Sequence, residues 1–286
     1  MKKVGLLYHP MKDGAYALAV KLGDFLISRG VTAWVCSAWE EKAAKVQVDG
    51  TDLILTIGGD GTILRAVQAV LPGTTPITGV NLGNLGFMTE LTVNETLEKL
   101  PAILAGEGWI DERSLLEAKL SPTESQPVPP LFYALNDVVA ARGAVARVIS
   151  VETSIDGERL TTYKADGVIV ATATGSTGYS LSAGGPILHP RAKESLLLPI
   201  LPHLGTAYPL VLPSTAVVTL RLSTTYPATL SIDGHTNLPL SNGTTISVRR
   251  SASTARFLRI HSPDSFYRSL EQKLKGKQPV EANGKS

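Results

Sequence analysis

Hydrophobic and polar positions follow two patterns along the first 110 residues. Short apolar runs rich in β-branched residues are typical of strands buried in a parallel sheet. The predicted strands lie at residues 4–8, 31–35, 53–57 and 77–80. Apolar residues spaced three or four apart predict helices at residues 13–29, about 40–45, after residue 62, and at 92–105. Strands that alternate with helices indicate a parallel sheet with right-handed crossovers, a Rossmann-like arrangement.

Two of these helices carry terminal signals. Asp13 is a candidate N-cap for the first helix, and Gly30 is its expected stop. Thr92 and Glu95 have the spacing of a capping box, which predicts a helix start at that point. Gly106 is expected to close the same helix.

The pattern changes after Ile110, where strand-like segments follow one another without helices. These segments lie at residues 115–120, 131–142, 145–155, 159–173, 216–222 and 244–250. Asp156-Gly157 and Asn242-Gly243 are the best hairpin turns, and the proline-rich stretch 121–130 indicates an exposed loop. Helical spacing returns at residues 262–275.

These patterns predict an α/β plus all-β protein. A Rossmann-like domain is expected at residues 1–111, and a β-rich, sandwich-like domain at residues 112–261. The C-terminal helix at 262–275 is expected to return to the first domain. The polar residues 276–286 are expected to be disordered.

Composition narrows the class of protein. A chain of 286 residues with 43% hydrophobic and 18% charged residues is an ordinary globular protein of about two domains. The net charge of +2 indicates neither a nucleic-acid partner nor a membrane surface. The single cysteine, Cys36, excludes an intramolecular disulfide, and the apolar stretch 196–212 contains prolines that a membrane helix would not tolerate. We therefore expect a soluble, cytoplasmic protein.

A glycine-rich turn follows the third predicted strand. Gly58-Gly59-Asp60-Gly61-Thr62 connects that strand to a helix, which presents backbone N–H groups to an anion such as phosphate. A carboxylate in a phosphate site repels its ligand, so Asp60 is expected to serve a proton or a metal ion. The alternative is an ordinary Asp-Gly turn. There is no GxxxxGK[ST] loop, and Gly79, Gly83 and Gly86 lack the dinucleotide spacing.

The β-rich half contains two more unusual stretches. Asn136 and Asp137 interrupt a predicted strand, although both residue types are disfavoured in strands; the alternative is a hairpin end or a bulge. Residues 163–187 surround an apolar strand with Thr, Ser and Gly, which offer donors to a flat or phosphorylated ligand. The alternative for this stretch is a low-complexity linker. The five histidines have no metal-ligand spacing, and we assign no metal to protein side chains.

In combination these motifs resemble the NAD kinases. The chain has GGDGT, the pair Asn136-Asp137, the block ADGVIVATATGSTGYSLSAGGPI and the turn Ile232-Asp233-Gly234 in the order of that family, and the resemblance covers about residues 4–274. It implies a Rossmann-like domain, a β-rich domain, and transfer of a phosphoryl group from ATP or polyphosphate to the adenosine ribose 2′-hydroxyl of NAD. A divalent cation, most often Mg²⁺, and a homodimer or homotetramer belong to the same expectation.

The resemblance also implies roles for particular residues. It makes Asp60 the catalytic base, and it makes Asn136 and Asp137 contacts of the adenosine part of NAD. The phosphates would be lined by Gly58, Gly59, Gly61 and Thr62. The NAD pocket would be lined by Phe87, Asp166, Thr174, Thr177, Gly178, Tyr179 and Ser182. We add Arg65 for the phosphates and Lys164 for NAD because they are close in sequence to the motifs, with a solvated surface role as the alternative.

Three positions depart from the family pattern. Asp137 stands where Glu is common, so its shorter carboxylate would need a water to reach the ribose. Gly178 stands where many members have Ala, and His235 where Gln is frequent, so His235 receives no role. Two alternatives stay open: a diacylglycerol-type lipid kinase, which shares GGDGT, and a non-catalytic NAD or NADP-binding module. The choice between ATP and polyphosphate, and between NAD and NADH, also stays open.

Overall fold

The computed structural model describes residues 1–83, 86–122, 130–143, 147–203, 208–263, 266–267 and 270. The chain forms two compact units, the first with residues 1–69, 75–110 and 258–286 and the second with residues 70–74 and 111–257. Most of the predicted C-terminal helix, the polar tail and the centre of the predicted loop at 121–130 lie outside the described residues. No helix in the described part of the chain is long and apolar enough to span a membrane.

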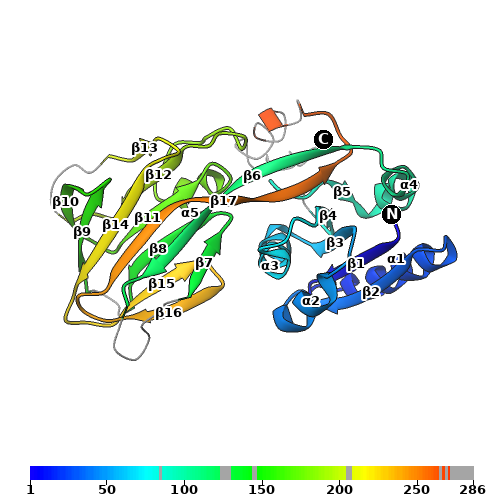
Figure 1. Ribbon diagram of the computed structural model, residues 1–286, viewed down its shortest axis with the longest axis horizontal. Coiled ribbons are helices and arrows are strands. Elements are labelled where there is room, and N and C mark those ends of the chain that lie inside the picture. Colours follow the sequence, from blue (N-terminus) through cyan, green and yellow to red (C-terminus); the bar gives the residue numbers. More distant parts are fainter. Residues whose placement is uncertain are drawn as a thin grey trace, which may run out of the picture. The chain divides into compact units, whose positions relative to one another are not determined.

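The first unit is the predicted Rossmann-like α/β fold. Its strands are β1 (Lys3–Tyr8), β2 (Thr32–Ser37), β3 (Leu53–Gly58), β4 (Ile77–Asn81) and the short β5 (Leu91–Thr92). Its helices are α1 (Ala15–Ser28), α2 (Glu41–Val48), α3 (Asp60–Val70) and α4 (Val93–Leu104). The strands are parallel in the order β5-β4-β3-β1-β2. All six residues of β3 are buried, as its continuous apolar run predicts, and β3 leads directly into α3 (Figure 1).

The helix ends match the sequence signals only in part. The capping box of α4 is confirmed, because the Thr92 hydroxyl accepts from the Glu95 N–H and the Glu95 carboxylate accepts from the Thr92 N–H. The assignment of Asp13 as N-cap is wrong. Gly14 precedes α1 in the left-handed region, with φ 76°, and no side chain caps this helix. The third helix starts at Asp60, before the predicted position, so the aspartate belongs to its first turn.

The second unit is a β-sandwich, as predicted. Its strands are β6 (Trp109–Leu120), β7 (Leu131–Ala134), β8 (Asp137–Arg142), β9 (Ile149–Ile155), β10 (Glu158–Ala165), β11 (Gly167–Thr172), β12 (Ser195–Ile200), β13 (Leu210–Leu212), β14 (Val217–Ser223), β15 (Ala228–Ile232), β16 (Thr236–Leu240) and β17 (Thr245–Arg259). Strands β6 and β17 each cross the boundary between the units along the chain. A 3₁₀ turn (Gly175–Thr177) and the short helix α5 (Tyr179–Ser182) follow β11.

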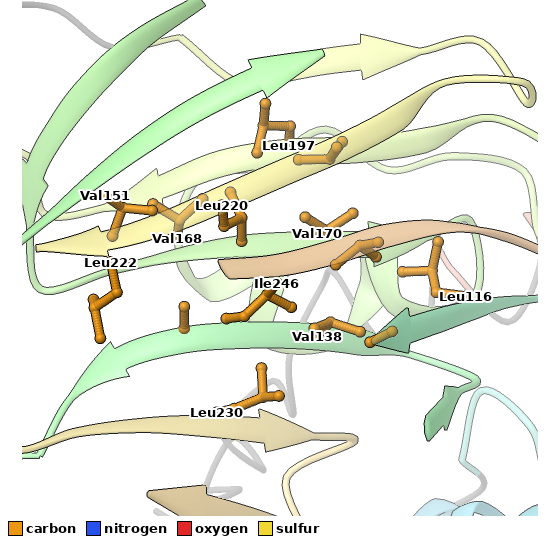
Figure 2. Packing of buried hydrophobic residues seen from close by; sticks show 14 of the residues in the cluster. Leu116, Val138, Val151, Val168, Val170, Leu197, Leu220, Leu222, Leu230 and Ile246 are labelled. Carbon is orange, nitrogen blue, oxygen red and sulfur yellow. The ribbon is translucent and has the colours of Figure 1, made fainter. Parts of the chain in front are cut away.

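Two antiparallel sheets enclose the core of this unit. One sheet has the order β13-β12-β11-β8-β15-β16, and β10, β9, β14 and β17 are neighbours in the other. Val138 and Val170 from the first sheet and Leu220 and Ile246 from the second belong to one buried cluster (Figure 2). The opposite face of β8, β11 and β12 is also buried, with Ala183 and Leu188 packed against it. Alternate residues of β11 therefore belong to two different cores, which explains its continuous apolar sequence.

Several strand assignments need correction. The Asp156-Gly157 hairpin between β9 and β10 is confirmed, but Asn242-Gly243 joins β16 to β17, which lie in different sheets. The single strands predicted at 131–142 and 159–173 are each divided in two, because the chain passes from one sheet to the other. The pattern analysis also missed β12, β13, β15 and β16. Alternation along a strand does not show where the chain changes sheets.

Candidate active site

The glycine-rich turn brings a strand end and a helix start close together. A Cβ atom at Gly58 would collide with the Thr62 hydroxyl, so this position excludes larger residues. A Cβ at Gly61 would meet no atom within 4 Å, and Gly61 is exposed. The Thr62 hydroxyl is fully buried and has no hydrogen-bond partner among the described residues. The turn therefore leaves space next to Gly61 and has a Thr62 hydroxyl without a partner, and both features are suited to a bound ligand.

Asp60 is fixed by a loop that is distant in sequence. Its Oδ2 accepts a hydrogen bond of 2.8 Å from the Phe87 N–H, and its Oδ1 accepts one of 3.1 Å from the Met88 N–H. A Cβ atom at Gly86 would collide with the Asp60 carboxylate, and the Gly86 N–H donates to the Thr89 hydroxyl over 2.8 Å. The structure thus brings the backbone of Phe87 to the Asp60 carboxylate. Asp60 therefore holds the backbone of this distant loop in addition to forming part of its own turn.

A buried ion pair holds the other side of this loop. Arg259 donates from Nη1 to the Met88 carbonyl over 2.7 Å and to Glu90 Oε2 over 3.2 Å. Glu90 Oε1 accepts from the N–H groups of Ile260 and His261, each over 2.8 Å. Both charged side chains are nearly inaccessible to solvent. A buried pair with satisfied hydrogen bonds orients its neighbours strongly, so the donors that hold Asp60 are themselves held.

Cationic side chains gather at the same turn. A Cβ atom at Gly59 would lie 3.4 Å from Lys12 Nζ, which places this lysine over the turn. The Arg65 guanidinium lies 4.2 Å from the Trp39 ring centroid, and the His9 ring lies 4.3 Å from the same ring. Burial lowers the pKa of His9, and the charges of Lys12 and Arg65 lower it further. In the described part of the chain, neither cation has a carboxylate within ion-pair distance, so both are available to an anion.

In the second unit, Asp233 organises the Asn136-Asp137 pair. Its Oδ2 accepts from the Leu135 N–H over 2.9 Å, and its Oδ1 accepts from the N–H groups of Asn136 and Asp137 over 2.7 and 3.1 Å. The Asp233 N–H in turn donates to the Asp137 carbonyl over 3.0 Å. Asp233 is buried and has a left-handed backbone with φ 51°. Burial raises its pKa, whereas the three N–H donors oppose this rise.

Asp137 is a buried acid at the first position of β8. Burial and the nearby charge of Asp233 raise its pKa to about 7. Only 5% of the residue is accessible. A strand end alone does not need a buried carboxylate, and a carboxylate with such a pKa is typical of a functional site.

The segment after β11 packs against this pair. The Thr172 N–H donates to the Asn136 carbonyl over 2.8 Å, and a Cβ atom at Gly175 would collide with that carbonyl. A Cβ at Gly178 would lie 3.6 Å from Asn136 Nδ2. Among described residues, the buried Asn136 Oδ1 and Ser180 Oγ atoms have no hydrogen-bond partner. Buried polar atoms that lack a partner in the protein are suited to hydrogen-bond a ligand.

The remaining predicted residues of this unit fall into two groups. Thr174 accepts a 3.4 Å hydrogen bond from Arg113, which also pairs with Asp111, and the Thr177 hydroxyl donates to the Thr174 carbonyl. Tyr179 and Ser182 are exposed on α5, in the same segment. Lys164 and Asp166 lie before β11, whereas Thr174 lies after it, which separates the groups by about 20 Å along the strand. At that far end, Asp166 pairs with Arg142 over 2.9 Å.

The sequence analysis missed three residues that shape these sites, namely Lys12, Arg113 and Arg142, and it assigned no role to Asp233. Lys12 and Arg113 carry no local signal, because each reaches its partners only through the fold. Asp233 did have a signal, because Ile232-Asp233-Gly234 is one of the family motifs, but an Asp-Gly turn by itself is common on surfaces. Its burial is what distinguishes it.

Comparisons with known proteins agree with the two units. The model of the ATP-NAD kinase N-terminal domain matches residues 11–108, and that of the ATP-NAD kinase C-terminal domain matches residues 135–260. A NAD kinase of Dehalococcoides mccartyi is 51% identical over 96% of each chain. A NAD kinase of Chloroflexus aurantiacus is 40% identical over 96% of this chain and 99% of its own.

Two solved structures have the same fold. Yeast NADH kinase complexed with NADH matches with a TM-score of 0.86 and 25% identity, over 99% of this chain and 90% of its own. An NAD kinase from Archaeoglobus fulgidus in complex with ATP matches with a TM-score of 0.74 and 26% identity, over 96% and 98%. Fold and motifs together define a nucleotide-dependent kinase. The chain belongs to the NAD kinase family.

Proposed function

We propose that this member of the NAD kinase family phosphorylates NAD to NADP with ATP as donor and with Asp60 as the catalytic base. The observation that carries the proposal is the Asp60 carboxylate, held by two backbone N–H groups inside a glycine-rich turn. The 51% sequence identity to a NAD kinase over 96% of the chain supports this reaction. The ATP complex of the archaeal relative supports the donor.

The reaction needs a proton acceptor beside the attacking hydroxyl. The 2′-oxygen of the adenosine ribose forms a bond to the γ-phosphorus, the bond to ADP breaks, and the hydroxyl proton passes to Asp60. Each Asp60 oxygen accepts one N–H bond in the structure and retains a further lone pair for the hydroxyl. Fixed orientation of the base suits phosphoryl transfer, in which catalysis is mostly positioning and charge stabilisation.

The donor phosphates would be held by backbone and cations. Gly58, Gly59, Gly61 and Thr62 would provide N–H groups and a hydroxyl, while Arg65 would provide charge. A divalent cation, most readily Mg²⁺, would be held by the phosphates, with Asp60 as the nearest carboxylate in this turn, and would neutralise their charge. The glycine-rich turn fits such an ion because its only acidic side chain keeps free lone pairs.

NAD would be bound by the second unit. Asn136 and Asp137 would hold the adenosine ribose, and the segment with Thr174, Thr177 and Gly178 would line the pocket. Tyr179 and Ser182 complete the proposed set in this unit, and Phe87 of the first unit is the remaining residue predicted to lie near NAD. Lys164 and Asp166 lie at the other end of β11 from this segment, so their assignment to NAD is the weakest supported by geometry. A cytoplasmic location and an assembly of two or four copies remain predictions.

The two alternative functions have less support. A lipid kinase of the diacylglycerol type shares GGDGT, but the comparisons match the C-terminal domain of ATP-NAD kinases. A binding module without activity would have no use for an oriented carboxylate at a phosphate turn. An assay of NADP formation with purified protein, ATP and Mg²⁺ decides between catalysis and retention of NAD. Polyphosphate in place of ATP tests the donor in the same assay.

The first prediction concerns Asp60→Asn. This change removes the charge of the base, and kcat should fall about 10²- to 10⁴-fold, the usual contribution of general base catalysis. NAD affinity, measured by calorimetry, should change little, because removing a negative charge near phosphates does not weaken their binding. Some loss of stability is also expected, since an amide oxygen can accept only one of the two N–H bonds.

Thr89→Ala is the matched control for this variant. It removes the acceptor of the Gly86 N–H in the same loop but leaves the Asp60 charge in place. The control should lower stability while kcat stays within about tenfold, under roughly 1.4 kcal/mol of barrier. The base assignment is wrong if Asp60→Asn keeps kcat within about threefold, or if Thr89→Ala reduces kcat as much.

A further inference from the structure

We infer that Asp233 is a positioning residue for NAD: its buried carboxylate sets the backbone of residues 135–137 and so directs Asn136 and Asp137 toward the nucleotide. This inference rests on the proposed function, because it takes Asn136 and Asp137 as ribose contacts. It adds a residue with no nucleotide contact of its own.

The three N–H groups bound by Asp233 lie where the chain changes sheets. The strand pairs of β7 with β6 end at Ala134, and those of β8 with β11 and β15 begin at Asp137 and Val138, so the N–H groups of Leu135 and Asn136 lie between the two sheets. The carboxylate takes the place of a strand partner there, with donors at 2.7 to 3.1 Å. Charge-assisted bonds of this length are strong and directional. They define the orientation of each peptide plane from 135 to 137.

The same segment is held from its other side. Thr172 donates from its N–H to the Asn136 carbonyl over 2.8 Å and from its hydroxyl to the Leu135 carbonyl over 2.5 Å. Asn136 therefore has its N–H bound by Asp233 and its carbonyl bound by β11. Its side-chain Oδ1 has no partner in the described part of the chain. A backbone fixed on both sides presents this amide and the Asp137 carboxylate in one defined direction.

A turn alone would not require this arrangement. Asp156 provides a comparison inside the same unit, since it also precedes a glycine, has φ 52° and accepts a backbone N–H, that of Val217, over 2.8 Å. Asp156 is exposed, whereas only 6% of Asp233 is accessible. Burying a carboxylate costs free energy unless hydrogen bonds compensate for its lost hydration, as the three N–H donors do at Asp233. The buried member of this matched pair is the one bound to the proposed ribose contacts.

Asp233→Asn tests the inference. An amide at this position keeps the size but can accept fewer of the three N–H bonds and points a donor at one of them. The KM for NAD should rise at least tenfold, while the KM for ATP stays within twofold. Hydrogen exchange of the peptide that contains residues 135–137 should become faster than in the parent. Asp156→Asn is the control and should lower the thermal midpoint without moving the KM for NAD.

A milder pair of variants covers the case in which Asp233→Asn does not fold. Gly234→Ala and Gly157→Ala both strain a glycine with positive φ, 71° and 86°, and neither new methyl group meets another atom within 4 Å. Gly234→Ala, which strains the backbone next to Asp233, should raise the KM for NAD severalfold. Gly157→Ala, which strains the backbone next to Asp156, should leave this KM unchanged. A folded Asp233→Asn with an unchanged KM for NAD overturns the inference, as do equal effects of the two alanine variants.

Asp137→Ala separates this inference from the proposed function. If NAD is bound as proposed, this variant should raise the KM for NAD about ten- to hundredfold, the effect of losing a charged hydrogen-bond partner. A parent protein that forms no NADP, or an Asp137→Ala variant with unchanged KM, refutes the proposed function. If both results are as expected and Asp233→Asn has no effect, the positioning role alone fails.

Discussion

Single carboxylates perform the same physical task in both units. Asp60 accepts N–H groups from residues 27 and 28 positions away, and Asp233 accepts three from residues 96 to 98 positions away. In each case the carboxylate binds backbone N–H groups that are distant in sequence and so fixes a segment that includes a proposed substrate contact. Such a contact is charge-assisted, so it is worth about twice a neutral hydrogen bond.

Asp137 leads to a prediction about pH. Its pKa is about 7 in the folded protein and near 3.8 when unfolded, so the folded state keeps a proton that the unfolded state loses between these values. This contribution to the free energy of unfolding is complete below about pH 4 and is lost as pH rises to about 7. The slope can reach about 1.4 kcal/mol per pH unit. Urea unfolding at pH 5, 6, 7 and 8 should show a flatter dependence for Asp137→Asn.

Asp156→Asn serves as the control in these titrations, because Asp156 is exposed whereas Asp137 is buried. Its pH dependence should follow that of the parent. Asp233 is the charged group that raises the pKa of Asp137, and His235 acts on Asp233 rather than on Asp137 directly. Identical slopes for the parent and Asp137→Asn would show that Asp137 is already ionised at pH 5.

At the scale of elements, helix ends show which local signals are sufficient. The box formed by Thr92 and Glu95 satisfies its donors within four residues, so its spacing alone predicted the start of α4. For α1, the left-handed Gly14 sets the entry of the chain, and Asp13 lies outside the cap position. A capping residue next to a glycine does not fix the start of a helix, because the glycine can adopt backbone angles that other residues avoid and so take the cap position itself.

Thr92→Ala should lower the free energy of unfolding by about 0.5–2 kcal/mol, because the Glu95 N–H loses its acceptor. Thr92→Ser keeps the hydroxyl and should retain most of the stability. Urea denaturation of both variants measures the difference. NADP formation by folded Thr92→Ala should equal that of the parent. A serine variant as unstable as the alanine variant would assign the effect to the lost methyl group.

At the scale of the whole molecule, the charge of the donor must be balanced. The glycine-rich turn has no lysine of the phosphate-loop type in its own sequence, although the fold places Lys12 over Gly59. One or two cations do not neutralise a triphosphate, so turnover should require a divalent cation. Excess chelator should abolish NADP formation, and added Mg²⁺ should restore it.

The thermal midpoint provides the control for the chelator experiment. If the ion arrives with the nucleotide, chelator should leave the midpoint of the protein without nucleotide unchanged. Full activity in excess chelator would refute the requirement. A lower midpoint in chelator would instead indicate a metal that stabilises the fold.

The sequence by itself determined what depends on near neighbours. The Rossmann-like order of the first unit followed from alternating periods, and the glycine-rich turn, the α4 cap and the Asp156-Gly157 hairpin followed from residues within a few positions of one another. These features have local causes, namely side-chain period, φ preference and capping bonds. The family motifs are also short and contiguous, so the NAD kinase resemblance could be stated from them.

Only the tertiary structure decided which distant groups meet. Lys12 over Gly59, Asp233 beneath residues 135–137, and Arg259 at the Met88 carbonyl join parts of the chain 47, about 97 and 171 residues apart. It also decided where β7 and β8 separate into two sheets, which alternation cannot reveal. The reason is physical: an alternating pattern shows that a face is buried but not what covers it. The partner of a buried charge depends on chain topology, and no local period encodes it.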